Sequence, residues 1–314
     1  MSETRQLRLA QESIAGLRPY QEDSVLTRTL SDGRTLVAVA DGMGGHAAGE
    51  VASNLALETL VEGLGEGQDL GAAFVLANER VHAKSSEPGK EGMGTTLVVM
   101  LVEEDSYRIG NVGDSRAYVM SSTGIRRITE DHSYVAEAVK RGQSESDAAA
   151  SEWRDVLTRA IGTDVEVEVD VFGPFPVEND TAVLLCSDGL YKALTDEDLL
   201  AVFGESGGPP GAAQALVTAA LEQGSDDNIS VAIAEFGEVP RNREADTVAI
   251  KWPPPDDSDE AEADTAEMPI PNGEGGEAET VSTDVATRTG PPMGVIGAVV
   301  AGVLLVVAYL VFGR

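Results

Sequence analysis

The chain has 314 residues and a formal net charge of -32, from 54 acidic and 22 basic residues. This acid excess excludes simple nucleic-acid binding, which needs a basic surface to replace counterions. The single cysteine, Cys186, rules out an intramolecular disulfide framework and favours a reducing compartment. Most of the acidic residues serve solubility, so residues with a chemical role must be identified by their positions.

The first third of the chain predicts a hairpin followed by two helices. Apolar runs at residues 25–30 and 35–40 flank the turn sequence Ser31–Arg34, which is typical of a β-hairpin. Apolar residues then recur at helical spacing over residues 47–63, and residues 70–84 continue as a second helix.

The middle of the chain predicts a β meander over residues 95–102, 107–112 and 116–121, with acidic and glycine-containing turns between the strands. Residues 132–151 have the loose, polar character of short helices. A further strand is predicted at residues 165–171.

The next region predicts strands at residues 181–187 and 229–236, separated by helices at 195–202 and 211–223. Thr195 and Asp198 have the spacing of a helix-capping box. Strands follow one another as hairpins, without the βαβ rhythm or glycine-rich loop of a doubly wound sheet. We therefore expect an α+β fold of antiparallel sheets covered by helix pairs.

Composition divides the chain into three parts. Residues 1–238 are expected to form one folded domain, and residues 239–292, rich in acids and proline, a disordered linker. Residues 293–312 carry no charge and are long enough to cross a hydrocarbon core of about 30 Å. A buried core helix is the alternative, but it would not follow a long acidic linker. We therefore expect residues 293–312 to be a C-terminal anchor in the cell (inner) membrane. Because the first residues lack a signal peptide, we expect the folded domain to be cytoplasmic.

Several carboxylates stand where predicted strands begin or end. They are Glu22 and Asp23 before residue 25, Asp41 after residue 40, Asp114 between two strands, Asp188 after residue 187, and Asp227 before residue 229. If these strand ends meet, the like charges require neutralisation, and divalent cations are the usual means. Oxygen ligands without a Cys/His pattern favour Mg²⁺ or Mn²⁺. Gly42 and Gly189 each follow an aspartate, where a glycine lets the backbone turn sharply and offer a carbonyl, although one Asp-Gly pair alone is an ordinary turn.

The order of these motifs resembles the metal-dependent Ser/Thr protein phosphatases, the PPM or type 2C family, in their bacterial form. The resemblance covers residues 5–236 and rests on Arg18-Pro19-Tyr20-Gln21-Glu22-Asp23, Asp41-Gly42-Met43-Gly44-Gly45-His46, Gly94-Thr95-Thr96, Gly113-Asp114-Ser115-Arg116, Ser187-Asp188-Gly189 and Asp226-Asp227-Asn228-Ile229-Ser230.

The resemblance implies a four-layer α-β-β-α sandwich with two Mn²⁺ or Mg²⁺ ions at one end. By this resemblance Asp41 would bridge the two ions. Asp188 and Asp227 would bind one ion, and Glu22 and the Gly42 carbonyl would bind the other. Asp23 would orient bound water. Arg18 would bind the substrate phosphate, and His46 would protonate the leaving group. A metal-activated water would attack phosphorus directly, without a phosphoenzyme.

Asp114 matches a ligand of a third, weaker ion in bacterial relatives, but Lys192 stands where some relatives have another aspartate. A third site should therefore be weak. Residues 130–162 resemble the family's flap, which borders the substrate. His82 and His132 are interpreted as structural or surface residues.

The expected function is hydrolysis of phosphoserine and phosphothreonine in proteins, with a membrane Ser/Thr kinase and its substrates as partners. A haloacid-dehalogenase-type enzyme is disfavoured because Asp41-Gly42-Met43 lacks the Asp-x-Asp nucleophile motif. The alternative from another class is a catalytically weak, membrane-anchored scaffold that binds phosphoproteins.

Overall fold

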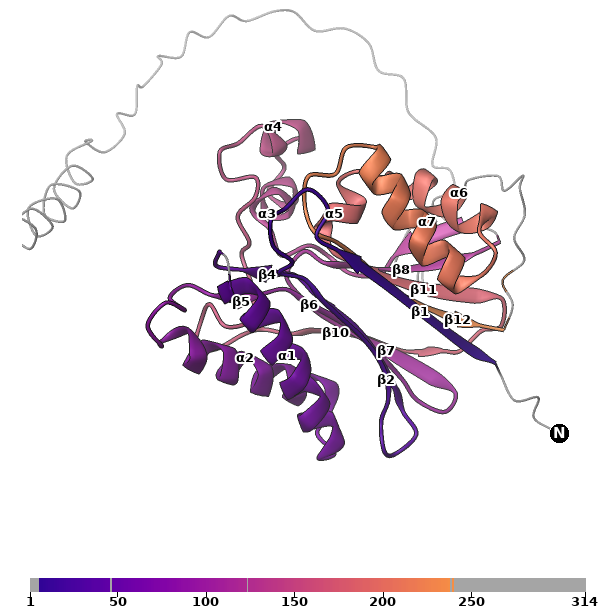
Figure 1. The fold of residues 1–314 in the computed structure, drawn as a ribbon, viewed down its shortest axis with the longest axis horizontal. Coiled ribbons are helices and arrows are strands. Elements are labelled where there is room, and N and C mark those ends of the chain that lie inside the picture. The colour runs from indigo at the N-terminus through magenta and orange to yellow at the C-terminus, as the bar shows by residue number, and fades with distance from the viewer. Residues whose placement is uncertain (1–5, 46, 123, 238, 240–314) are drawn as a thin grey trace, which may run out of the picture. The chain divides into compact units, whose positions relative to one another are not determined.

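Two antiparallel β-sheets form the centre of the domain (Figure 1). The computed structural model describes residues 6–45, 47–122, 124–237 and 239. Sheet A contains, in order, β1 (Leu7–Ile14), β12 (Ile229–Phe236), β11 (Thr181–Cys186), β8 (Arg116–Ser121) and β9 (Gly124–Arg127). Sheet B contains β10 (Asp170–Pro176), β7 (Ser106–Val112), β6 (Leu97–Val102), β3 (Thr35–Ala40) and β2 (Ser24–Thr29). A short pair joins β4 (Gly42–Met43) and β5 (Gly94–Thr95).

Helices cover the outer faces of both sheets. The antiparallel pair α1 (Ala47–Gly65) and α2 (Leu70–Ser85) packs on sheet B, and α6 (Asp196–Glu205) and α7 (Pro209–Glu222) pack on sheet A (Figure 1). The short helices α3 (Tyr134–Lys140), α4 (Glu145–Ala149) and α5 (Asp188–Tyr191) lie toward one end. The predicted four-layer α-β-β-α sandwich is confirmed.

The central strand β12 shows how the sequence produces these layers. All eight of its residues are buried. Side chains alternate along a strand, so Val231 and Ile233 pack with the helices of sheet A, while Ala232 and Ala234 pack against sheet B. A strand buried on both faces needs a predominantly apolar sequence. In β12 the two polar residues, Ser230 and Glu235, are also fully buried.

The predicted strand at 165–171 is misplaced, because β10 begins only at Asp170, which pairs with Asn111. Val167 and Val169 produced the apolar signal, but they pack against the core beneath α1 and α2 instead.

The predictions also omitted β1, β4, β9 and α5. In contrast, the Thr195–Asp198 capping box at the start of α6 is confirmed. β1 is mostly half-buried and mixes polar with apolar residues, so its sequence lacks a strong strand pattern.

Within the described part of the chain, no helix combines the length and apolar character needed to cross a bilayer. The predicted span at 293–312, and the predicted linker beyond Val239, lie outside the described residues. Val239 itself is buried against the core of α6 and α7.

Candidate active site

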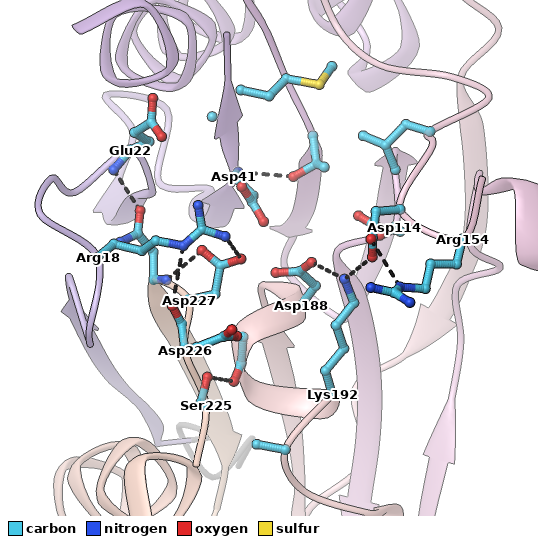
Figure 2. A pocket seen from close by; sticks show the side chains of 18 of the residues that line it. Arg18, Glu22, Asp41, Asp114, Arg154, Asp188, Lys192, Ser225, Asp226 and Asp227 are labelled. Carbon is cyan, nitrogen blue, oxygen red and sulfur yellow. Dashed lines mark hydrogen bonds and ion pairs between the residues drawn. The ribbon is translucent and has the colours of Figure 1, made fainter. Parts of the chain in front are cut away.

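An open cleft of about 720 Å³ lies at one end of the two sheets. The predicted residues Arg18, Glu22, Asp41, Gly42, Asp114, Asp188 and Asp227 all line it (Figure 2). Asp23 lies beneath it and is only 6% exposed. Both sheets contribute, because Asp41 follows β3 of sheet B, whereas Asp188 follows β11 and Asp227 precedes β12 of sheet A.

The Asp41 backbone is held by two threonines. Its N–H donates to Thr96 Oγ1 at 2.9 Å, and its carbonyl accepts from the Thr96 N–H at 2.8 Å and from Thr95 Oγ1 at 2.9 Å. Thr96 Oγ1 also lies 2.7 Å from Ser115 Oγ, next to Asp114. The Gly94-Thr95-Thr96 motif therefore fixes Asp41 and connects it to the Asp114 turn.

Glycine 42 allows three segments to meet. A Cβ at this position would lie 2.2 Å from the Gly49 carbonyl oxygen in α1 and 2.5 Å from the Glu22 carbonyl oxygen. A Cβ on Gly49 would lie 2.5 Å from Glu22 Oε1, so the Glu22 side chain rests directly on the first turn of α1.

Glycine 189 has the same role between Asp188 and Asp227. A Cβ here would lie 2.1 Å from the Asn228 carbonyl oxygen. Neither Gly42 nor Gly189 has a positive φ, so neither glycine is needed for a left-handed backbone conformation. These glycines are needed for close backbone approach instead.

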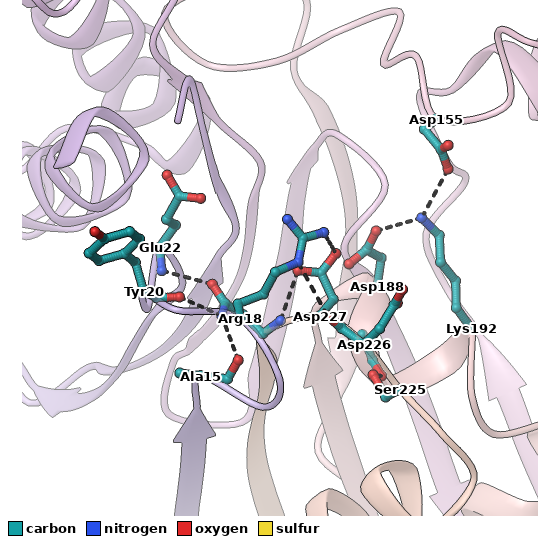
Figure 3. Close-up of polar contacts among 12 residues, drawn as sticks. Ala15, Arg18, Tyr20, Glu22, Asp155, Asp188, Lys192, Ser225, Asp226 and Asp227 are labelled. Atoms are coloured by element: carbon teal, nitrogen blue, oxygen red, sulfur yellow. Dashed lines mark hydrogen bonds and ion pairs between the residues drawn. The ribbon is translucent and has the colours of Figure 1, made fainter. Parts of the chain in front are cut away.

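Asn228 holds the loop that carries Arg18 and Glu22. Its Oδ1 accepts from the Glu22 N–H at 2.8 Å, and its Nδ2 donates to the carbonyls of Ala15 at 3.0 Å and Tyr20 at 2.9 Å. Figure 3 labels these three partners. Arg18 then reaches the cleft, where Nη2 donates to Asp227 Oδ2 at 2.7 Å and Nε to the Asp226 carbonyl at 3.2 Å.

Burial makes this carboxylate cluster costly to ionise. It raises the pKa of Asp23 and of Asp114 to about 7, and the charge of Asp188 contributes to both shifts. Burial, and then the charges of Asp23 and Asp188, raise the pKa of Asp41 well above its ordinary value. A bound cation would reverse this effect by stabilising the ionised forms.

The donor set fits hard divalent cations. It consists of carboxylate and carbonyl oxygens, and Asp188 Oδ1 and Asp23 Oδ2 are buried without a hydrogen-bond partner. As the side chains stand, no three acidic, histidine or cysteine groups among the described residues are arranged to hold one ion. Arg18 on Asp227 and Lys192 on Asp188 supply positive charge to this cluster.

The roles predicted for the three histidines can be compared with the structure for His82 and His132. His46, the predicted proton donor, lies outside the described residues. His132 is 1% exposed, accepts from the Gly113 N–H at 3.0 Å and lies 3.1 Å from Asp170 Oδ2, so it is structural. His82 Nδ1 lies 3.1 Å from the Gly162 carbonyl.

Burial raises the pKa of the Cys186 thiol to about 12, which keeps this cysteine protonated and excludes it as a nucleophile.

The sequence motifs contain Thr96 and Asn228 but do not indicate their contacts. Arg154 and Asp155 also line the cleft and were not among the predicted site residues. Thr96 and Asn228 belong to the motifs that suggested the family, and this membership was the available signal. Arg154 and Asp155 lie in the predicted flap, where no local pattern distinguishes them from surface charges.

Comparisons with known proteins agree with this geometry. Residues 19–223 match the family described as Protein phosphatase 2C. The serine/threonine phosphatase Stp of Listeria welshimeri is 34% identical over 241 residues, covering 73% of this chain and 95% of its own length.

Solved structures are similar as well, and two of them illustrate this. A Streptococcus agalactiae serine/threonine phosphatase superposes with a TM-score of 0.69 at 29% identity, covering 73% of this chain and 99% of that chain. The catalytic domain of PstP, solved with two manganese ions, has a TM-score of 0.64 at 33% identity, covering 75% and 100%. This chain therefore belongs to the protein phosphatase 2C family.

Proposed function

We propose that this chain is a protein serine/threonine phosphatase that hydrolyses phosphoserine and phosphothreonine with the help of two Mn²⁺ or Mg²⁺ ions. The observation that carries the proposal is the meeting of Asp41, Asp188 and Asp227 from both sheets in one open cleft, in a chain of the protein phosphatase 2C family.

The residues of the cleft have distinct roles in this proposal. Asp41, held by Thr95 and Thr96, would bridge the two ions. Asp188 and Asp227 would hold one ion, Glu22 and the Gly42 carbonyl the other, and buried Asp23 would orient water. When bound, such ions lower the pKa of water so that it can attack phosphorus near neutral pH.

Arg18 is placed to change partners during the cycle. In this structure its guanidinium neutralises Asp227 at 2.7 Å. Cation binding to Asp227 would take over that neutralisation and release a planar, bidentate donor for the substrate phosphate. His46 would then protonate the departing serine or threonine oxygen.

The test is hydrolysis of p-nitrophenyl phosphate and of phosphothreonine peptides by the full-length chain in detergent with Mn²⁺. We expect activity that chelation with EDTA abolishes and that Asp41→Asn or Asp188→Asn reduces by at least about a thousandfold, because charge stabilisation at the reacting phosphoryl group is lost. Asp32→Asn, on the exposed β2–β3 turn, is the matched control. A folded, Mn²⁺-saturated chain without activity would favour the scaffold alternative.

Membrane attachment is the second part of the proposal. The uncharged run 293–312 would serve as the anchor, residues 239–292 as an extended linker, and the domain would face the cytoplasm. In fractionated cells the full chain should stay with membranes after alkaline washing, and a chain ending at residue 292 should not. Equal recovery of both chains in the soluble fraction would refute the anchor.

This attachment would confine the enzyme to phosphoproteins near the membrane, including a membrane Ser/Thr kinase and its substrates. Comparing phosphoproteomes of cells that express the full chain, the chain ending at residue 292, or neither would test it. We expect the sites that depend on the anchor to lie in membrane proteins.

A further inference from the structure

Lys192 places an ammonium group among three carboxylates of the cleft. It directly follows α5, one helical turn after Asp188, a spacing that brings two side chains together. Its Nζ lies 2.7 Å from Asp188 Oδ2 and 3.7 Å from Asp155 Oδ1 (Figure 3). Asp114 lines the same part of the cleft (Figure 2).

The contact with the Lys192 ammonium gives the two carboxylate oxygens of Asp188 different environments. Oδ2 is occupied by Lys192, whereas Oδ1 is buried and has no hydrogen-bond partner. The Asp188 carboxylate stands between Lys192 and Asp227 (Figure 2). Lys192 therefore holds one oxygen and leaves the other available for an ion shared with Asp227.

The second contact of Lys192 reaches a different segment. Asp155 belongs to the flap residues 151–157, whose backbone is held by the Tyr134 N–H to Val156 carbonyl bond at 2.8 Å. The Asp155 side chain is 68% exposed, compared with 14% for Asp188. Lys192 thus connects an exposed flap residue to a deep carboxylate.

Charge determines what else can bind here. An additional divalent cation between Asp114 and Asp188 would approach an ammonium that already lies 2.7 Å from Asp188. Because like charges disfavour each other strongly in a partly buried cluster, the cation would have to displace Lys192. The displacement would also break the contact with Asp155.

We propose that Lys192 is a positioning residue whose ammonium takes the place of an additional divalent cation beside Asp114 and Asp188 and fastens the flap to the active site. This inference rests on the proposed function. The chain would use two exchangeable ions and the fixed positive charge of Lys192. The contact between Asp155 of the flap and Lys192 would then persist at metal concentrations too low to fill a weak third site.

The first test counts bound ions on the full-length chain in detergent, by equilibrium dialysis against Mn²⁺ followed by elemental analysis. We expect two ions for the wild type and for Lys192→Arg, which keeps the charge, but three for Lys192→Asp. Equal ion numbers in the wild type and Lys192→Asp would overturn the substitution of ammonium for metal. A wild type that binds no Mn²⁺ would contradict the proposed function, and the second test would then decide the flap contact.

The second test measures amide hydrogen exchange of residues 153–156. Lys192→Gln and Asp155→Asn should each accelerate exchange about two- to fivefold, the range expected for losing one partly exposed ion pair. Asp155→Asn also removes the ion pair with Arg154 at 3.2 Å. The double variant should therefore be no faster than Asp155→Asn, because Lys192→Gln then removes no further contact with Asp155, and amides of β12 should not change. Unaltered exchange in both single variants, or additive acceleration in the double variant, would refute the link.

Discussion

The buried Asp23 carboxylate makes the stability of the metal-free protein depend on pH. Its pKa is about 7 in the folded chain and 3.8 in the unfolded reference. Between these values the folded state holds a proton that the unfolded chain has released, so the free energy of unfolding falls as pH rises. At 1.36 kcal/mol per pKa unit, the ionised Asp23 costs about 4 kcal/mol at most above pH 7.

Asp23→Asn removes this cost without changing the size of the side chain. In EDTA, the free energy of unfolding of the variant minus that of the wild type should increase between pH 5 and 8, approaching about 4 kcal/mol. Chemical unfolding followed by circular dichroism measures both curves. With saturating Mn²⁺ the wild type should instead gain stability as pH rises, because protons then compete with the cations.

Asp32→Asn is the control, because hydrogen bonds from Arg34 lower the Asp32 pKa. That carboxyl is ionised in both states from pH 5 to 8, so this variant should run parallel to the wild type. Parallel curves for Asp23→Asn and the wild type in EDTA would show that Asp23 is not held protonated, and would refute the reasoning.

Three further substitutions test the scaffold around the site. Gly189→Ala would put a Cβ 2.1 Å from the Asn228 carbonyl oxygen, so it should destabilise the fold by roughly 1–3 kcal/mol and weaken Mn²⁺ binding measured by calorimetry. Thr96→Val removes the acceptor for the Asp41 N–H and should weaken Mn²⁺ binding about 10- to 100-fold, the usual effect of losing a group that orients a ligand; unchanged affinity would contradict its role. Thr195→Ala removes the α6 capping box and should lower the unfolding free energy by about 1 kcal/mol while phosphatase activity stays the same; a large loss of activity would show that α6 matters for more than stability.

The fold was largely predictable because its central strands are buried on both faces. Such strands, including β3, β6 and β12, appear in the sequence as predominantly apolar runs with clear ends, although β12 also contains Ser230 and Glu235. The edge strands β1 and β9 are short or half-buried, so solvent-facing residues dilute their pattern. The misplaced strand near residue 170 has the opposite cause, since Val167 and Val169 are apolar for packing without belonging to the sheet.

The carboxylates of the site were predictable because each stands at the end of a strand, and an open sandwich brings strand ends together. The contacts between these carboxylates and the residues that hold them in place were not predictable. The Asn228 contacts with the Arg18–Glu22 loop join residues about two hundred positions apart, and no local pattern encodes such a distance. The resemblance to the family gave the ligand list, but only the structure shows Lys192 spanning Asp188 and Asp155.

The placement of the carboxylates on both sheets also has a mechanical consequence. Asp41 extends from sheet B, Asp188 and Asp227 from sheet A, and Asp114 lies where the chain crosses from β7 to β8. Ions shared by these residues would hold the two sheets together at one end, whereas farther along the strands the sheets are joined by side-chain packing, such as the Tyr107 ring on the Phe236 ring. Separation of the two sheets would then begin at the end away from the ions. Removal of the metal would allow the sheets to separate at both ends.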